Sequence, residues 1–343
     1  MQTLDERTKK VLFAVVESYI NFHGPVGSRF VTKRYSLGFS PATIRNIMAD
    51  LEDMGLLIQP HTSAGRMPTD RGYRIYVNSL VSEGYHYNRV ILDEIYKRLE
   101  ILKDNIELML SEIPKSLSML TSYLGVAMSP KPNMTTLKRI ELLKFKTDKV
   151  AVIIFTDEGI IKNKIINLDS DIAQKDLNRI AGYLNSEFSG LTFDEIRLRI
   201  LEEIAEEKTK YSSLIFKAIR ICREALCFIQ SDLFVSGLSE VLELPDFADL
   251  RKIKELSRAI EDKHTIIKLL DKISNAEGVQ IIIGSENSMD EMKRLSMVAS
   301  ACKDENNHSV AVVGIIGPTR MDYEKAIWLV DNTAKFVTKM LAK

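Results

Sequence analysis

The chain contains 343 residues, 45% hydrophobic and 27% charged, and its 47 basic and 47 acidic side chains give a formal net charge of zero. This length exceeds what one compact core can organise and predicts two or three domains. The neutral balance excludes a protein coated with phosphate-binding charge. No run of about 18 apolar residues is present to cross a bilayer, and the polar N-terminus lacks a secretion signal. We therefore expect a cytoplasmic protein without membrane contact.

Metal and disulfide chemistry are not expected from the residues that could support them. The three cysteines, which lack C-x-x-C spacing, are Cys222, Cys227 and Cys302. The five histidines, which form no H-E-x-x-H motif, are His23, His61, His86, His264 and His308. We therefore expect reduced thiols, no bound metal and no cofactor.

The chain opens with a pattern typical of a helix-turn-helix. Thr3-Leu4-Asp5-Glu6 has the T-x-x-E spacing of a capping box. An apolar face follows to about Phe22, and Gly24-Pro25 is typical of a helix end. Residues 26–35 form a short amphipathic segment, and residues 37–39 make a tight connection to the next helix.

That next helix has two distinct faces. Ser40-Pro41 predicts its start, because a hydroxyl caps the first turn and proline presets φ, and Gly55 predicts its end. The apolar residues that share one face are Ile44, Ile47, Met48, Leu51 and Met54. The residues of the opposite face are Ala42, Arg45, Asn46 and Ala49. Small residues let a helix enter the major groove, where arginine and asparagine pair with guanine and adenine edges.

A hairpin and a closing helix follow. Leu56-Leu57-Ile58 is strand-like, residues 59–67 form a loop, and Thr69 caps a helix over residues 70–80. This order predicts a winged helix that binds DNA, and an ordinary helical domain with a charged surface is the alternative. Residues 28–74 hold seven Lys/Arg against four Asp/Glu, so each subunit would bind DNA modestly and two would act together.

We assign the expected DNA contacts from these faces. Base reading is assigned to Arg45 and Asn46, and apolar base contact to Ala42 and Ala49. The residues expected to contact phosphate are Ser28, Ser40, Thr43, His61 and Arg66.

An apolar seam with heptad spacing occupies residues 88–113. It could pair with a mate in a dimer, or lie on the sheet of the following domain. We favour the second, because three heptads are near the lower limit for a coiled coil. Pro114 is expected to break or restart the helix, which then runs to about Ala127 before a linker over residues 129–133.

Two groups of strands enclose a helical stretch. The first group is expected at residues 139–146, 150–156 and 160–167, and the second at 279–284, 296–302 and 309–316. Between them, residues 172–230 read as helical, with a capping box at Thr192-Phe193-Asp194-Glu195. A last helix is expected over residues 322–341. This order predicts an α+β sheet domain interrupted by an insertion, although residues 232–237 could belong to either part.

An enzyme is not expected. Residues 314–320 could be a phosphate cradle, but they lack the lysine and hydroxyl of a P-loop. We prefer a buried strand that closes in a turn, with Arg320 paired to an acid such as Asp322 or Glu324. No G-x-S-x-G motif or carboxylate pair suited to acid–base chemistry is present.

Three motifs resemble one protein family over nearly the whole chain. They are residues 40–77, from Ser40-Pro41 to Tyr76-Val77; Val235-Ser236-Gly237-Leu238 with Leu244-Pro245-Asp246-Phe247; and Ile316-Gly317-Pro318-Thr319-Arg320-Met321-Asp322-Tyr323. The sequence is similar to the heat-inducible transcription repressor HrcA family. One departure is Ser285, where the family pattern tends to have an acidic residue.

The resemblance implies a fold and a function. It implies a winged-helix DNA-binding domain (1–87) and a GAF-like domain in two parts (88–170 and 236–343), which enclose an inserted dimerising domain (171–235). It also implies a homodimer on the CIRCE inverted repeat of chaperone operons, release on heat shock and dependence on the GroE chaperonin. The alternatives are a repressor controlled by a small ligand in its GAF-like domain, and a nucleotide-binding or enzymatic protein.

Overall fold

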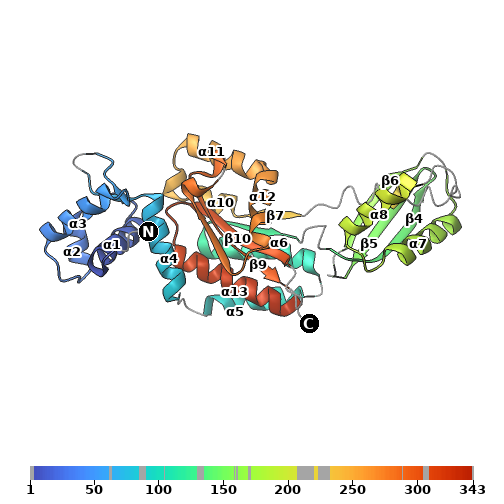
Figure 1. Ribbon diagram of the computed structural model, residues 1–343, viewed down its shortest axis with the longest axis horizontal. Coiled ribbons are helices and arrows are strands. Elements are labelled where there is room, and N and C mark those ends of the chain that lie inside the picture. The colour runs from blue at the N-terminus through green and yellow to red at the C-terminus, as the bar shows by residue number, and fades with distance from the viewer. Residues whose placement is uncertain are drawn as a thin grey trace.

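The computed structural model has an N-terminal module at one end, a central module, and a lobe at the other end (Figure 1). The residues that it describes are 4–61, 64–84, 90–103, 105–129, 135–157, 159, 161–168, 171–206, 220–222, 232–287, 289–303 and 309–341. No helix among them is both long enough and apolar enough to pass through a membrane.

The N-terminal module comprises residues 4–84. Its elements are α1 (Glu6–Phe22), α2 (Ser28–Arg34), α3 (Pro41–Asp53), β1 (Leu57–Ile58), β2 (Met67–Pro68) and α4 (Asp70–Glu83). The predicted helices and hairpin are confirmed. Thr3 of the predicted capping box lies outside the described residues. Helix α1 is capped by Asp5, whose Oδ1 accepts the backbone N–H of Thr8 at 2.6 Å.

The central module, residues 90–129 and 232–341, is built on a five-stranded antiparallel sheet. In order of pairing, its strands are β7 (Leu233–Ser236), β3 (Leu124–Met128), β10 (Ser309–Pro318), β9 (Leu295–Lys303) and β8 (Val279–Ile283). The short helices that connect them are α10 (Leu238–Leu242), η2 (Pro245–Phe247), η3 (Gly284–Glu286) and η4 (Asp290–Met292).

Longer helices cover both faces of this sheet. The helices over one face are α5 (Val90–Ile101), α6 (Ile106–Thr121) and α13 (Tyr323–Leu341), and those over the other are α11 (Leu250–Glu261) and α12 (Lys263–Ser274). Along β10, Val313 and Ile315 face the first layer while Val312 and Ile316 face the second. The module is a three-layered α+β unit, which confirms the predicted fold class. Its GAF-like character stays a prediction.

The lobe has its own sheet and core. Its elements are β4 (Leu137–Lys146), β5 (Lys149–Thr156), β6 (Ile161–Asn167), α7 (Gln174–Phe188) and α8 (Phe193–Glu206). The helices bury one face of the sheet through residues such as Leu184, Phe188 and Ile196. The predicted capping box is confirmed, because Thr192 and Glu195 exchange hydrogen bonds between side chain and backbone.

The lobe begins earlier in the chain than predicted. The sequence predicts the strands over residues 139–167 in the same domain as the later strands, and the insert at 171–235. Among the described strands, β4, β5 and β6 pair only with one another, so they belong to the lobe with α7 and α8. Strand β7, in the segment left open, pairs with β3 in the central sheet. Strands joined by short turns tend to pair with one another as a meander. The periodicity of apolar residues predicts strands but does not show which strands pair.

The apolar seam packs within the chain, as we favoured. Helix α6 lies on the sheet, and Tyr96 of α5 stacks on Phe336 of α13 with ring centroids 4.0 Å apart. The helix is interrupted at the cap residue Asn105 and continues through Pro114, so the predicted break at the proline is wrong. Residues 124–127, predicted as the end of a helix, lie in the buried strand β3. A continuous apolar run has no period that separates a buried strand from a buried helix.

Candidate nucleic-acid interface

Helix α3 is held at both ends and on one face. Ser40 Oγ accepts the backbone N–H of Thr43 at 3.1 Å, and Gly55 adopts the left-handed φ of 71° that ends the helix. The buried residues of its inner face are Ile44, Ile47, Met48 and Leu51. Met54, predicted on that face, is 41% exposed, because it lies at the C-cap where the helical direction ends. The inner face fixes which side chains point outward.

The outward face of α3 carries the predicted DNA contacts. Ala42, Arg45 and Asn46 are exposed, and Ala49 is half-buried. Arg45 and Asn46 form no side-chain hydrogen bond or ion pair with the residues that the structure describes. Their donors and acceptors are therefore available to a partner. The structure places these four residues on one face, as predicted, and leaves their role a prediction.

The residues predicted to contact phosphate are dispersed. Ser40 is exposed but its hydroxyl is engaged in capping, 2.9 Å from Thr43 Oγ1. Ser28 is half-buried at the start of α2, where its carbonyl accepts the hydroxyl of Thr32. His61 is exposed in the β1–β2 loop. Within the described chain, the side chains of Ser28 and His61 are outside local hydrogen bonding, whereas those of Ser40 and Thr43 are engaged with each other.

Arg66 has a structural role that the sequence did not reveal. Its Nε donates to Glu52 Oε2 at 2.9 Å, and its side chain is only 15% exposed. Its backbone N–H and C=O pair with those of Val26 at 2.9 and 2.8 Å. The hairpin is thus fastened both to α3 and to the segment before α2. The phosphate contact predicted for Arg66 would require its guanidinium to serve two partners.

Further basic residues lie on α1 and α2. On α2, Arg29 and Lys33 are exposed and form no ion pair within the described chain. Arg34 lies over the ring of Phe22, and Arg7 lies 4.6 Å from the ring centroid of Phe39. Stacked arginines keep their charge while their position is fixed. The sequence shows that these residues are basic. It does not show which of their side chains stack on an aromatic ring, because each ring belongs to another segment of the chain.

Helix α4 attaches the N-terminal module to the central module. Arg74 donates from Nε to Glu286 Oε1 and from Nη2 to the carbonyl of Ile281, both at 2.7 Å. Asp70 accepts the backbone N–H of Ser285 at 2.8 Å. Because Ser285 contributes through its backbone, its departure from the family pattern leaves this contact intact.

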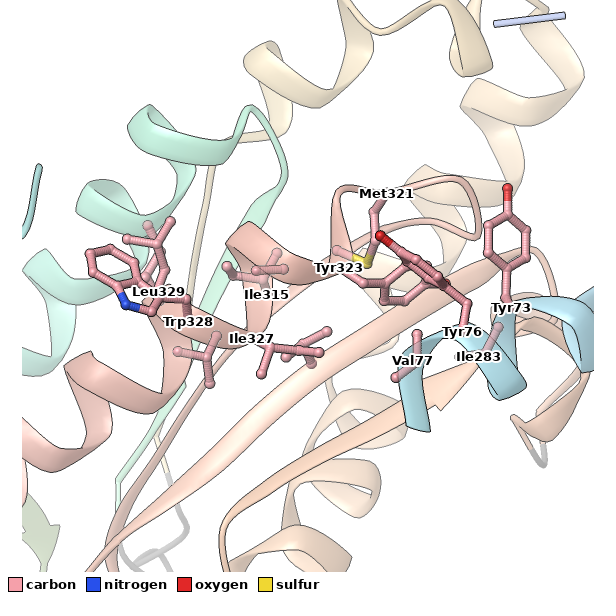
Figure 2. Close-up of a cluster of buried hydrophobic side chains, with 14 of the residues drawn as sticks. Tyr73, Tyr76, Val77, Ile283, Ile315, Met321, Tyr323, Ile327, Trp328 and Leu329 are labelled. Carbon is pink, nitrogen blue, oxygen red and sulfur yellow. The ribbon is translucent and has the colours of Figure 1, made fainter. Parts of the chain in front are cut away.

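An aromatic cluster lies beside these polar contacts. The ring of Tyr73 on α4 lies 5.7 Å from that of Tyr323 on α13, and Figure 2 shows both within the cluster of α4 and C-terminal residues. Tyr323 is fully buried and hydrogen-bonds to Ser296 at 2.7 Å. The position of α3 relative to the central sheet therefore depends on buried contacts as well as on ion pairs.

The remaining residues singled out in the sequence have structural surroundings of their own. Arg320 pairs with Asp246 at 2.5 Å and not with the predicted Asp322 or Glu324, since the turn after β10 brings it against η2. No group of histidine, cysteine or acidic residues in the described ranges is arranged to hold a metal. Burial raises the pKa of Cys302 to about 12, so this thiol is a core residue. Cys227 lies outside the described residues.

The comparisons with known proteins agree with this geometry. The profile of the HrcA protein C terminal domain matches residues 107–327. The chain is 45% identical to the heat-inducible transcription repressor HrcA of Thermodesulfovibrio yellowstonii, over 99% of this chain and 98% of that one. It is 41% identical to the repressor of the same name from Geobacter sulfurreducens, over 99% of each chain.

A solved structure supports the fold independently. It is described as the crystal structure of a hypothetical protein, covers 99% of each chain with a TM-score of 0.63, and is 21% identical. Together with the exposed α3 face, the comparisons define an α+β transcriptional repressor. The chain belongs to the heat-inducible transcription repressor HrcA family.

Proposed function

We propose that this repressor acts as a homodimer on an inverted-repeat operator of the CIRCE type in chaperone operons, and that heat stress releases it. The observation that carries the proposal is the exposed face of α3, where Arg45 and Asn46 have no partner among the described residues. A two-fold symmetric dimer would present two such helices to successive major grooves. The fixed caps of α3 support direct base reading, because side chains on a rigid helix need little ordering when they bind.

Gel shift on three duplexes tests this proposal: the inverted repeat, a single half-site and a scrambled sequence. We expect the inverted repeat to bind at least about tenfold more tightly than the half-site, because the second module binds intramolecularly. The complex, sized by light scattering, should contain two chains. Equal affinity for the inverted repeat and the scrambled duplex would contradict sequence-specific repression.

The uncovered face of the lobe supports the dimer. On the side of β4–β6 away from α7 and α8, Leu143, Phe145, Ile161 and Ile165 are 47–55% exposed. Leu143 pairs with Ala151, which pairs in turn with Ile165, so the apolar residues continue across the strands. Contiguous apolar surface of this kind marks an interface. We assign it to a second copy of the chain, whose identical face would be self-complementary about a two-fold axis.

The same surface supports the proposed dependence on the GroE chaperonin. A chain that exposes apolar strands before it pairs is prone to aggregate, and a chaperonin binds such surface. Refolding after mild heating, with and without chaperonin, tests this. We expect recovered operator binding to rise with chaperonin, and equal recovery in both samples would contradict the proposal.

A further inference from the structure

A cavity of about 330 Å³ lies between the N-terminal and central modules. The N-terminal module contributes Tyr19, Met67 and Tyr73 to its lining, and the central module contributes Phe247, Leu256 and Arg320. This volume is at the lower end of the range of small-molecule sites, about 300–1,000 Å³. Because both modules form its walls, a molecule inside would contact both at once.

Two buried polar groups of the lining have no partner. The hydroxyl of Tyr73 and Nε of Arg320 are buried and make no hydrogen bond to the part of the chain that the structure describes. Arg320 uses only Nη2, which donates to Asp246 at 2.5 Å. In Figure 2 the hydroxyl of Tyr73 points away from Val77 and Ile283. Buried polar groups are normally satisfied, and leaving one unpaired destabilises the folded chain.

Both groups are hydrogen-bond donors under ordinary conditions. Burial raises the pKa of Tyr73 well above its usual value, so its hydroxyl keeps its proton. Arginine carries five N–H donors and no acceptor. A molecule in the cavity that carries acceptor oxygens would satisfy these two donors.

The charges around the cavity favour an anion. Its cationic residues are Lys252, Lys293, Arg294 and Arg320, and its acidic residues are Asp70, Asp246 and Glu255. Most of these charges are paired: Asp246 with Arg320, Glu255 with Arg294, and Lys293 with Asp290 outside the lining. Asp70 accepts the backbone N–H of Ser285. Lys252 is exposed and forms no ion pair with the residues described. Its charge is available to an incoming carboxylate.

We propose that this cavity binds a small organic carboxylate, whose apolar body lies against Phe247, Leu256 and Met67 and whose oxygens accept from Tyr73 and Arg320. The ligand bridges the two modules, so it stabilises the arrangement in which both walls are present. An effect on DNA affinity rests on the proposed repressor function. Binding to the cavity does not.

Calorimetric titration of the full chain with indole-3-acetate and phenylacetate tests the proposal. Indole-3-acetamide, which keeps the shape but lacks the charge, is the matched probe. We expect at least one carboxylate to bind, and the amide to bind at least about tenfold more weakly, because hydrogen bonds to charged groups are the stronger ones. Absence of binding by both carboxylates, or equal binding of the amide, overturns the proposal.

The variant Tyr73→Phe removes one proposed donor and leaves the packing of the ring. Since that hydroxyl has no partner, the unliganded variant should unfold at the same temperature or higher. Its affinity for the carboxylate should fall about fivefold to tenfold. Tyr76→Phe, one turn further along α4 and outside the lining, is the control and should bind normally. Unchanged affinity of Tyr73→Phe overturns the placement of the carboxylate.

The calorimetric titration contains no DNA. A negative titration therefore contradicts the ligand site and leaves the proposed repressor function untouched. In a separate gel shift, the carboxylate that binds should change the affinity of the wild type for the inverted repeat, and it should have less effect on Tyr73→Phe. A ligand that binds while operator affinity stays constant would confirm the site and contradict its link to DNA binding.

Discussion

At the scale of single residues, Arg45 is the most informative side chain of the α3 face. It is exposed and has no partner among the described residues. Arg45→Ala should weaken operator binding by about 1–3 kcal/mol and relax the preference at one base pair, because a bidentate contact to a base edge is lost. Gel shift on operators with single base changes measures both effects.

The control for Arg45 is an exposed basic residue outside α3. Lys33→Ala on α2 removes an exposed charge. It should weaken all duplexes by the same factor and reduce the salt dependence, as loss of a phosphate contact does. An equal loss on operator and scrambled DNA for Arg45→Ala would remove Arg45 from the base-reading residues.

Arg66 should behave differently from both. Because its guanidinium pairs with Glu52 in a largely buried position, Arg66→Ala should lower the free energy of unfolding by about 1 kcal/mol. Thermal unfolding measures this, and Glu52→Gln should reproduce most of the loss. An unchanged unfolding temperature, combined with weaker DNA binding, would restore the phosphate role that the sequence suggested.

At the scale of elements, the hairpin depends on Gly65. A Cβ at this position would lie 2.4 Å from the carbonyl carbon of Val26, and that backbone cannot move without breaking its pairing with Arg66. Gly65→Ala should therefore displace the hairpin and cost about 2 kcal/mol or more. Gly24→Ala, where the nearest atom is 4.0 Å away, is the matched control and should change the unfolding temperature little.

Local signals explain which elements the sequence could predict. Ser40-Pro41 and Gly55 act within one helix, so α3 and its outward face followed directly from them. The contact between Gly65 and Val26 joins residues far apart in the chain and left no local mark. Residues 124–127 of β3 were mistaken for helix, because a strand buried on both faces lacks alternation. Which strands pair with one another also depends on residues far apart in the chain. The same is true of the buried donors that line the cavity.

At the scale of the whole molecule, the lobe and the N-terminal module lie at opposite ends of the molecule (Figure 1). If the uncovered sheet face joins two copies, changes there should alter DNA binding without any contact to DNA. The double variant Leu143→Glu/Ile165→Glu puts charges on that exposed face, where the folded monomer can solvate them. It should become monomeric by light scattering.

The monomeric variant separates avidity from recognition. Its affinity for a single half-site should equal that of the wild type, because α3 is unchanged. Its affinity for the full inverted repeat should fall by about 10²- to 10⁴-fold, since the second module no longer binds intramolecularly. Ser186→Glu, an exposed neutral residue on α7 at the covered side of the lobe, is the control for added charge and should stay dimeric. A double variant that remained dimeric, or that bound the full repeat normally, would move the dimer interface elsewhere.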